Sequence, residues 1–174
     1  MKLVLIGMMG AGKSTVGRLV AGALHRPFID TDMIVEVRAG KLIREIFAEG
    51  GEGEFRLRET EAIREAVAFA GSVIATGGGA VLSPVNRELL RESAFVVWLD
   101  AEPEELYRRA MRQGAAARPL LNGPDPLAVL RQRRAERAEA YQQTAHIRIN
   151  AGGRSPEETA AEVTRLLLAR EGNA

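Results

Sequence analysis

Cysteine is absent from this 174-residue chain, and no apolar run approaches the roughly 20 residues that a membrane-spanning helix requires. The lack of cysteine excludes disulfide bonds and cysteine-ligated metal sites, and it is typical of cytoplasmic proteins. Met1 and Lys2 lead directly into an apolar segment that reads as a core strand, so we expect no signal peptide. A net charge of +1 gives no indication of nucleic-acid binding. We therefore expect a cytoplasmic protein that binds neither membranes nor nucleic acid.

Lysine is also scarce, because only three of the 24 basic residues are lysines and the other 21 are arginines. The chain is otherwise ordinary for a globular protein, with 46% hydrophobic and 27% charged residues. Its length predicts a single domain over residues 1–174, long enough to bury about two-thirds of its unfolded surface. The useful question is therefore which arginines occupy positions where a solvated charge is not expected.

Short apolar segments alternate with longer segments of helical pattern along the whole chain. The expected strands are Leu3–Ile6, Phe28–Asp30, Val73–Thr76, Phe95–Leu99 and Ile147–Asn150. The expected helices lie near residues 13–24, 31–49, 54–70, 84–92, 103–112, 125–143 and 156–170. This alternation predicts a three-layer α/β fold, in which helices flank a five-stranded parallel sheet. The continuous apolar run at 95–99 is expected inside the sheet, and the alternating run at 146–149 at a half-exposed edge.

The most informative segment is residues 7–15, Gly-Met-Met-Gly-Ala-Gly-Lys-Ser-Thr. It follows the first expected strand and leads into an amphipathic helix, as a phosphate-binding P-loop does. The glycines let backbone N–H groups converge on a phosphate, and the new helix adds the positive end of its dipole. Lys13 is expected to reach the β- and γ-phosphates, and the Ser14 hydroxyl to hold Mg²⁺. The chain is therefore predicted to bind a nucleoside triphosphate.

Asp30 and Asp32 follow the second expected strand, at the same edge of the sheet as the P-loop. In an extended segment they project to the same side. One carboxylate could hold a metal-bound water, and the other could orient an acceptor hydroxyl beside Mg·ATP. The alternative is that Asp32 is simply the N-cap of the following helix.

Gly77, Gly78 and Gly79 follow the third expected strand. Three successive glycines could form a plain turn between a strand and a helix. They also remove every side chain from one wall, so that a ligand can approach backbone N–H groups closely. Their position at the carboxyl edge of the sheet favours the second interpretation.

Two arginines are predicted to face inward. Arg56 lies on the expected inner face of its helix with Ile63, Val67 and Ala70, near the positive end of the helix dipole. Arg137 shares the apolar stripe of a later helix, which Leu127, Leu130 and Tyr141 mark. Two inward guanidiniums suggest bidentate capture of a substrate carboxylate or phosphate. Alternatively, either arginine pairs with an internal acid such as Glu59 or extends to water.

Arg118 lies in the one irregular stretch, Gln113–Pro126, which is rich in alanine, glycine and proline. A loop of this kind in a compact domain is usually functional or disordered, and Arg118 is predicted to be a lid cation for the transferred phosphoryl group. The other arginines, such as Arg131, Arg133 and Arg134, are interpreted as solvated or paired helix charges.

Taken together, these segments resemble the shikimate kinase family. The resemblance rests on the P-loop, Phe-Ile-Asp-Thr-Asp (28–32), Gly-Glu-Phe-Arg-x-x-Glu (53–59), Ala-Thr-Gly-Gly-Gly-Ala-Val (75–81), Arg-Pro-Leu-Leu (118–121) and Arg-x-x-x-Tyr (137–141), in that order. The P-loop is common to many kinases, whereas the other elements in this order are more specific. The resemblance covers essentially the whole chain, and it implies a P-loop kinase fold with a lid at about 113–124.

The resemblance also implies an activity, which is transfer of the γ-phosphoryl group of ATP to the 3-hydroxyl of shikimate, a step in aromatic amino acid biosynthesis. Shikimate 3-phosphate and ADP are the products, Mg²⁺ is the cofactor and a monomer is expected. The implied ATP-binding residues are Gly10, Ala11, Gly12, Lys13, Ser14, Thr15, Arg112, Arg118 and Arg154. The implied shikimate-binding residues are Asp32, Arg56, Gly78, Gly79 and Arg137. Ser14 and, through water, Asp30 would hold the metal, and Lys13, Asp32 and Arg118 would be catalytic.

Two alternatives remain at this point. Another small-metabolite kinase, such as a gluconate kinase, shares the P-loop and the chain length, but it does not explain the Phe-Arg-x-x-Glu and Arg-Pro-Leu-Leu elements. A catalytically silent nucleotide-binding module would be favoured by loss of Lys13, Asp32 or Arg118, and all three are present.

Overall fold

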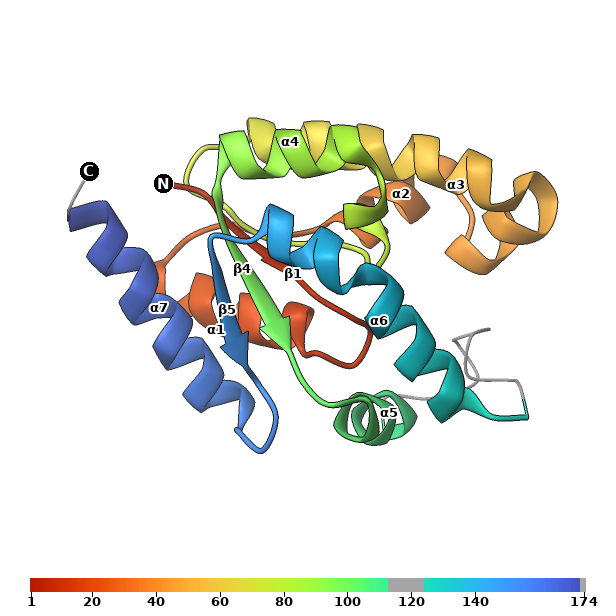
Figure 1. Ribbon diagram of the computed structural model, residues 1–174. Helices are drawn as coiled ribbons and strands as arrows, with labels where there is room; N and C mark the ends of the chain where they lie inside the picture. Colours follow the sequence, from red (N-terminus) through yellow and green to blue (C-terminus); the bar gives the residue numbers. More distant parts are fainter. Residues whose placement is uncertain (113–123, 173–174) are drawn as a thin grey trace.

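A computed structural model of the chain describes residues 1–112 and 124–172 (Figure 1). The elements in chain order are β1 (Leu3–Ile6), α1 (Lys13–Leu24), β2 (Phe28–Asp30), α2 (Thr31–Ala39), α3 (Ile43–Ala68), β3 (Val73–Ala75), the 3-10 helix η1 (Ala80–Leu82), α4 (Pro84–Ser93), β4 (Phe95–Asp100), α5 (Pro103–Arg112), α6 (Pro126–Thr144), β5 (Ile147–Asn150) and α7 (Pro156–Gly172). The predicted lid, including Arg118, lies outside the described residues except for Pro124.

The five strands form one parallel sheet in the order β2-β3-β1-β4-β5. Helices α1 and α7 cover one face of this sheet, and α3, α4 and α6 cover the other (Figure 1). The predicted three-layer α/β fold with a five-stranded parallel sheet is therefore confirmed.

Burial along the strands follows the apolar pattern of the sequence. Every residue of β1 and of β4 is buried, since both strands lie inside the sheet with helices on both faces. The expected interior position of residues 95–99 is confirmed, although β1 and not β4 is the middle strand. At the edge, β5 buries Ile149 and exposes Arg148, as the alternating pattern predicts.

The helix boundaries between residues 31 and 70 differ from the prediction. The helix expected over 31–49 ends at Ala39, because Gly40 adopts a left-handed conformation with φ of 62°. The break expected near residue 50 is present as a kink within α3, where Gly51 is non-helical with φ of 71° and ψ of −173°. Helix α3 ends at Ala68, so Ala70 is exposed and the prediction that Ala70 faces inward is wrong.

The carboxyl ends of β1, β2 and β3 are adjacent in the sheet, so the segments that follow them meet at one edge. These segments are the P-loop, the start of α2 and the triple-glycine turn. Within the described residues, no helix combines the length and the apolar character that crossing a membrane requires.

Candidate active site

A cleft of about 820 Å³ opens at the carboxyl edge of the sheet. Its walls are formed by the P-loop, the start of α2, the N-terminal half of α3, the triple-glycine turn and the middle of α6. The sequence-predicted residues that line it are Gly10, Gly12, Lys13, Ser14, Thr15, Asp30, Asp32, Arg56, Gly78, Gly79 and Arg137. The structure thus brings together residues predicted to serve phosphate, metal and acceptor in one cavity.

The P-loop adopts a conformation that its glycines make possible. Gly10 and Gly12 have φ of 77° and 91°, in the left-handed region that side chains disfavour. A Cβ on Gly10 would lie 2.4 Å from the carbonyl oxygen of Leu106, so this position also has no space for a side chain. Ala11 contributes only backbone to the loop, since its side chain is buried.

Helix α1 begins beneath this loop with its backbone N–H groups directed at the cleft. Its N-cap is Gly12, no side chain caps it, and its first turn contains no acidic residue. The uncapped N-terminus and the helix dipole therefore favour an anion at this end. Lys13 is held at the same place, because its Nζ donates to the carbonyl oxygens of Gly7 at 2.8 Å and Met8 at 3.0 Å.

Ser14 and Asp30 lie side by side at the base of the P-loop. The Ser14 hydroxyl donates to Oδ2 of Asp30 at 2.7 Å, so two oxygen ligands suited to Mg²⁺ are already in contact. The other oxygen of Asp30 accepts from the backbone N–H of Asp32 at 3.1 Å. Asp30 is therefore the N-cap of α2, and the alternative that Asp32 is the cap is wrong.

Asp32 lies in the first turn of α2, and its side chain is directed into the cleft. Its geometry differs from the extended segment that was expected, because the helix already starts at Thr31. Its Oδ1 is buried and has no hydrogen-bond partner among the described residues. Burial, together with the charges of Asp30 and Glu59, raises the pKa of Asp32 to about 7, although Lys13 opposes the shift.

Glu59 meets Asp32 at the first glycine of the turn. A Cβ on Gly77 would lie 2.7 Å from Oδ1 of Asp32 and 2.7 Å from Oε1 of Glu59, so glycine lets two carboxylates converge here. Glu59 is fully buried, and its Oε1 has no partner in the part of the chain that the structure describes. Burial raises the pKa of Glu59, while the charge of Arg56 opposes that shift.

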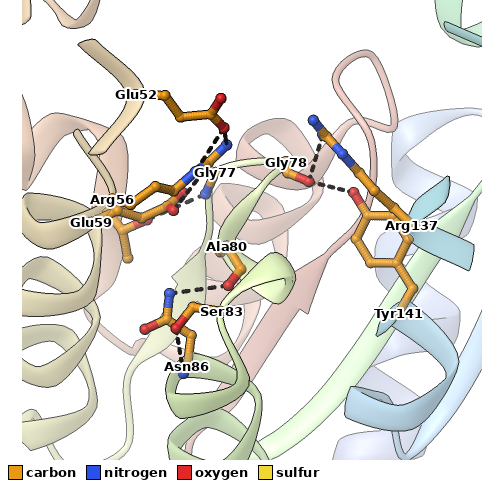
Figure 2. Close-up of polar contacts among 11 residues, drawn as sticks. Glu52, Arg56, Glu59, Gly77, Gly78, Ala80, Ser83, Asn86, Arg137 and Tyr141 are labelled. Carbon is orange, nitrogen blue, oxygen red and sulfur yellow. Dashed lines mark hydrogen bonds and ion pairs between the residues drawn. The ribbon is translucent and has the colours of Figure 1, made fainter. Parts of the chain in front are cut away.

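Arg56 is directed into the cleft from α3, just after the kink at Gly51. Its Nη1 donates to Oε2 of Glu59 at 2.7 Å, and its Nη2 donates to Oε1 of Glu52 at 2.8 Å (Figure 2). Pairing with Glu59 was one of the alternatives from the sequence, and it is observed. The same guanidinium nevertheless lines the cleft and lies against Gly79, where a Cβ would be 2.4 Å from both terminal nitrogens.

Arg137 reaches the cleft from α6 on the opposite side of the glycine turn. Its side chain is buried, and its Nη1 donates to the carbonyl oxygen of Gly78 at 3.0 Å (Figure 2). It forms no ion pair with a carboxylate among the described residues. A buried guanidinium that is bonded only to neutral groups is costly unless an anion joins it.

The first residue of the glycine turn, Gly77, is fixed by hydrogen bonds from both of its backbone polar groups. The N–H of Gly77 donates to the Thr31 hydroxyl at 3.3 Å, and its carbonyl accepts from Ala80 at 3.2 Å. By contrast, the N–H groups of Gly78 and Gly79 have no hydrogen-bond partner among residues 1–112 and 124–172. The turn therefore offers backbone donors to a ligand between the two arginines.

Two of the implied ATP-binding residues, Arg112 and Arg154, which the resemblance places beside the adenine, do not line this cleft. Arg112 is the exposed last residue of α5, and Arg154 forms an ion pair with Glu162 after β5. These two segments are joined by Arg109, whose Nη2 donates to the carbonyl oxygens of Ala151 at 2.7 Å and Arg154 at 3.2 Å. The sequence analysis missed Arg109, because a bond to a distant backbone carbonyl leaves no local pattern.

Other cleft residues were also missed or misassigned. Phe47 and Phe55, whose rings lie 4.7 Å apart, form an apolar wall beside Arg56. Arg133, interpreted from the sequence as a solvated or paired charge, is half-buried and lines the cleft, which the sequence analysis did not predict. Its spacing of four residues from Arg137 was the available signal, since such residues share a helix face.

Comparison with known proteins gives a consistent result. A family model described as shikimate kinase matches residues 9–168. The shikimate kinase of Symbiobacterium thermophilum is 54% identical over 170 residues, which cover 98% of each chain. The solved structure of shikimate kinase from Acinetobacter baumannii in complex with shikimate has a TM-score of 0.92 at 37% identity, covering 97% of this chain and 93% of that one. Shikimate kinase from Aquifex aeolicus has a TM-score of 0.80 at 34% identity, over 99% and 98% of the two chains.

Proposed function

This chain belongs to the shikimate kinase family, and we propose that separate groups of residues in its cleft bind ATP, Mg²⁺ and shikimate. The enzyme transfers the γ-phosphoryl group of ATP to the 3-hydroxyl of shikimate, giving shikimate 3-phosphate and ADP. One observation carries the assignment of residues. Two inward arginines and two free backbone N–H groups share one cleft with Lys13 and Asp32.

The ATP phosphates are assigned to the P-loop, over Gly10–Thr15. The uncapped N-terminus of α1, with the positive end of its dipole, and the charge of Lys13 support this assignment, since both stabilise anionic oxygens. ATP-dependent kinases neutralise further phosphate charge in the transition state, and Arg118 is the residue proposed for that role. Arg112 and Arg154 are proposed for the adenine side, and Arg109 holds their two segments together through its bonds to the carbonyl oxygens of Ala151 and Arg154.

Mg²⁺ is assigned to Ser14 and, through water, Asp30. The fit is supported by their direct contact, because the Ser14 hydroxyl can bind the metal while the adjacent Asp30 carboxylate accepts from a metal-bound water. No group of three histidine, cysteine or acidic side chains that could hold a metal occurs within residues 1–112 and 124–172, so substrate phosphate oxygens and water would complete the coordination. When bound, the metal would neutralise charge on the β- and γ-phosphates.

The shikimate carboxylate is assigned to the space between Arg56 and Arg137, with the N–H groups of Gly78 and Gly79. Arginine binds carboxylates with two parallel hydrogen bonds, and a buried guanidinium gains most from such a partner. The ring of shikimate would then lie over the apolar wall of Phe47 and Phe55.

The reacting hydroxyl is assigned to Asp32. Its unpartnered Oδ1 can accept a hydrogen bond from the 3-hydroxyl and orient it towards the phosphate on the P-loop. Its raised pKa makes the carboxylate a better proton acceptor than a solvated aspartate. Phosphoryl transfer needs mainly positioning and charge neutralisation, so this residue and Lys13 should contribute most strongly to turnover among the described residues.

A coupled assay of ADP release tests the function directly. With ATP and Mg²⁺ present, ADP release should depend on added shikimate, and phosphate should appear on the 3-hydroxyl. Gluconate should not replace shikimate. Equal ADP release with and without shikimate would contradict the proposed acceptor site.

Arg137→Ala should weaken shikimate binding by about 2–5 kcal/mol, because the substrate carboxylate would lose a desolvated partner. ATP affinity should change little. Isothermal titration calorimetry with each substrate measures both effects. Arg131→Ala is the matched control, since Arg131 lies on the same helix and pairs with Glu104 outside the cleft. Unchanged shikimate affinity in Arg137→Ala, with a lower melting temperature, would make Arg137 a structural residue.

Arg56→Ala should also weaken shikimate binding by about 2–5 kcal/mol, but it leaves Glu59 buried without its cation. We therefore expect a lower melting temperature as well. The double variant Arg56→Ala/Glu59→Gln removes the unpaired charge and should recover stability without recovering shikimate affinity. Recovery of both would mean that Arg56 only neutralises Glu59.

We further propose that residues 1–174 act as a single domain and as a monomer. The P-loop, Asp32, Arg56 and Arg137 line one cleft within a single copy of the chain, which supports a monomer. A cytoplasmic location is proposed because the reaction consumes ATP.

A further inference from the structure

Tyr141 completes the Arg-x-x-x-Tyr element, but the assignments above give it no role. It lies one turn after Arg137 on α6, and its side chain is fully buried. Its hydroxyl donates to the carbonyl oxygen of Gly78 at 2.6 Å, the same oxygen that accepts from Nη1 of Arg137 (Figure 2). A carbonyl oxygen has two lone pairs, so both are used by α6.

The anchored carbonyl fixes the direction of the next amide. All described peptide bonds are trans, so the Gly78 carbonyl and the Gly79 N–H point in opposite directions. Because the carbonyl points to α6, the N–H of Gly79 points away from α6. Gly79 itself lies against the guanidinium of Arg56, on the other side of the cleft from Arg137. The Gly79 N–H has no partner among the described residues.

We propose that Tyr141 is a positioning residue for shikimate binding. Its hydroxyl fixes the Gly78–Gly79 peptide, so that the Gly79 amide and the Arg137 guanidinium are oriented before the substrate carboxylate arrives. This inference rests on the proposed assignment of the carboxylate to Arg56, Arg137 and the glycine turn. Preorganisation of this kind reduces the ordering cost of binding.

The ring of Tyr141 is itself held in place. It stacks on Trp98 of β4, with centroids 5.4 Å apart and an interplanar angle of 19°. The guanidinium of Arg148 lies 4.7 Å from the centroid of the Trp98 ring and donates to Asp100 at 2.6 Å. Burial raises the pKa of Tyr141 above its usual range, so the hydroxyl keeps its proton and remains a donor. The anchor of Gly78 is therefore rigid and independent of pH in the physiological range.

Tyr141→Phe tests the inference, because it removes the hydroxyl and keeps the stacked ring. The Gly78 carbonyl then has one partner, and the peptide can rotate. We expect the KM and the Kd of shikimate to rise about 5- to 20-fold, which corresponds to loss of one hydrogen bond. The kcat and the KM of ATP should stay within about twofold of the wild type, since the reacting groups and the P-loop are untouched.

Thr144→Val is the matched control. Thr144 is also buried on α6, and its hydroxyl donates to the carbonyl oxygen of Ala140 within the helix at 2.6 Å. Both variants lose one buried hydroxyl, so both should lower the melting temperature by a similar amount. Only Tyr141→Phe should change shikimate affinity.

The outcomes separate this inference from the proposed function. If Arg137→Ala weakens shikimate binding while Tyr141→Phe only lowers the melting temperature, Tyr141 is structural and the inference is wrong. A fall in kcat at unchanged shikimate KM would also overturn it. If neither variant changes shikimate affinity, the carboxylate assignment fails and this inference fails with it. Calorimetry with shikimate alone, below the melting temperature of each variant, gives the Kd without any activity measurement.

Discussion

Lys13→Ala should lower kcat by at least about 10³-fold, because the change removes a fixed charge from the β- and γ-phosphates, where negative charge develops. The fold should persist. Lys13 bonds to the carbonyl oxygens of Gly7 and Met8 at the edge of an open cleft, where water can replace it. We therefore expect a melting temperature within a few degrees of the wild type. Steady-state kinetics and thermal unfolding of the purified variant check both expectations.

Lys41→Ala is the matched control for this experiment. Lys41 is an exposed lysine that pairs with Glu49 at 2.5 Å, and it does not line the cleft. It should leave kcat, both KM values and the melting temperature nearly unchanged. A Lys13→Ala enzyme with turnover close to the wild type would contradict the assignment of ATP to the P-loop.

The parts of the site that could be predicted are those where the local sequence demands a particular backbone or charge. The P-loop is the clearest case, since Gly10 and Gly12 adopt left-handed φ values directly before a helix. The inward positions of Arg56 and Arg137 were predicted from helical periodicity. Each arginine is a cation on the apolar face of its helix, and this alone indicated that both line the cleft.

Features that depend on distant partners could not be predicted. Asp32 was expected in an extended segment, but it lies in the first turn of α2, and Asp30 is the N-cap, which turns Asp32 into the cleft. Arg109 was missed for a similar reason, because its bonds to Ala151 and Arg154 join segments more than 40 residues apart in the chain. The convergence of Asp32 and Glu59 on Gly77 likewise exists only after three elements have packed together.

Asp32→Asn should lower kcat by roughly 10²–10⁴-fold, because the amide keeps the shape of the side chain but cannot accept a proton or align the hydroxyl through charge. Shikimate affinity should fall much less, since Arg56 and Arg137 still bind the carboxylate. The helix cap is unaffected, because Asp30 and not Asp32 caps α2. Measurement of kcat together with the Kd of shikimate separates orientation from binding. A kcat within a few-fold of the wild type would show that Asp32 is not catalytic.

The same variant should be more stable than the wild type at neutral pH, in the absence of nucleotide and metal. Folding raises the pKa of Asp32 from 3.8 to about 7, so the folded state binds more protons than the unfolded state between these values. The free energy of unfolding of the wild type therefore falls as the pH rises through this interval, by the contribution of this carboxyl.

Asparagine does not titrate, and its amide can donate to the unpartnered Oε1 of Glu59. The stability advantage of Asp32→Asn should thus be small near pH 4, grow towards pH 7 and remain constant above it. Urea unfolding of both proteins across this range tests the sign. An advantage that shrinks with rising pH would contradict this prediction. It would mean that the folded protein stabilises the Asp32 carboxylate, so that the charge needed for catalysis has no cost in stability.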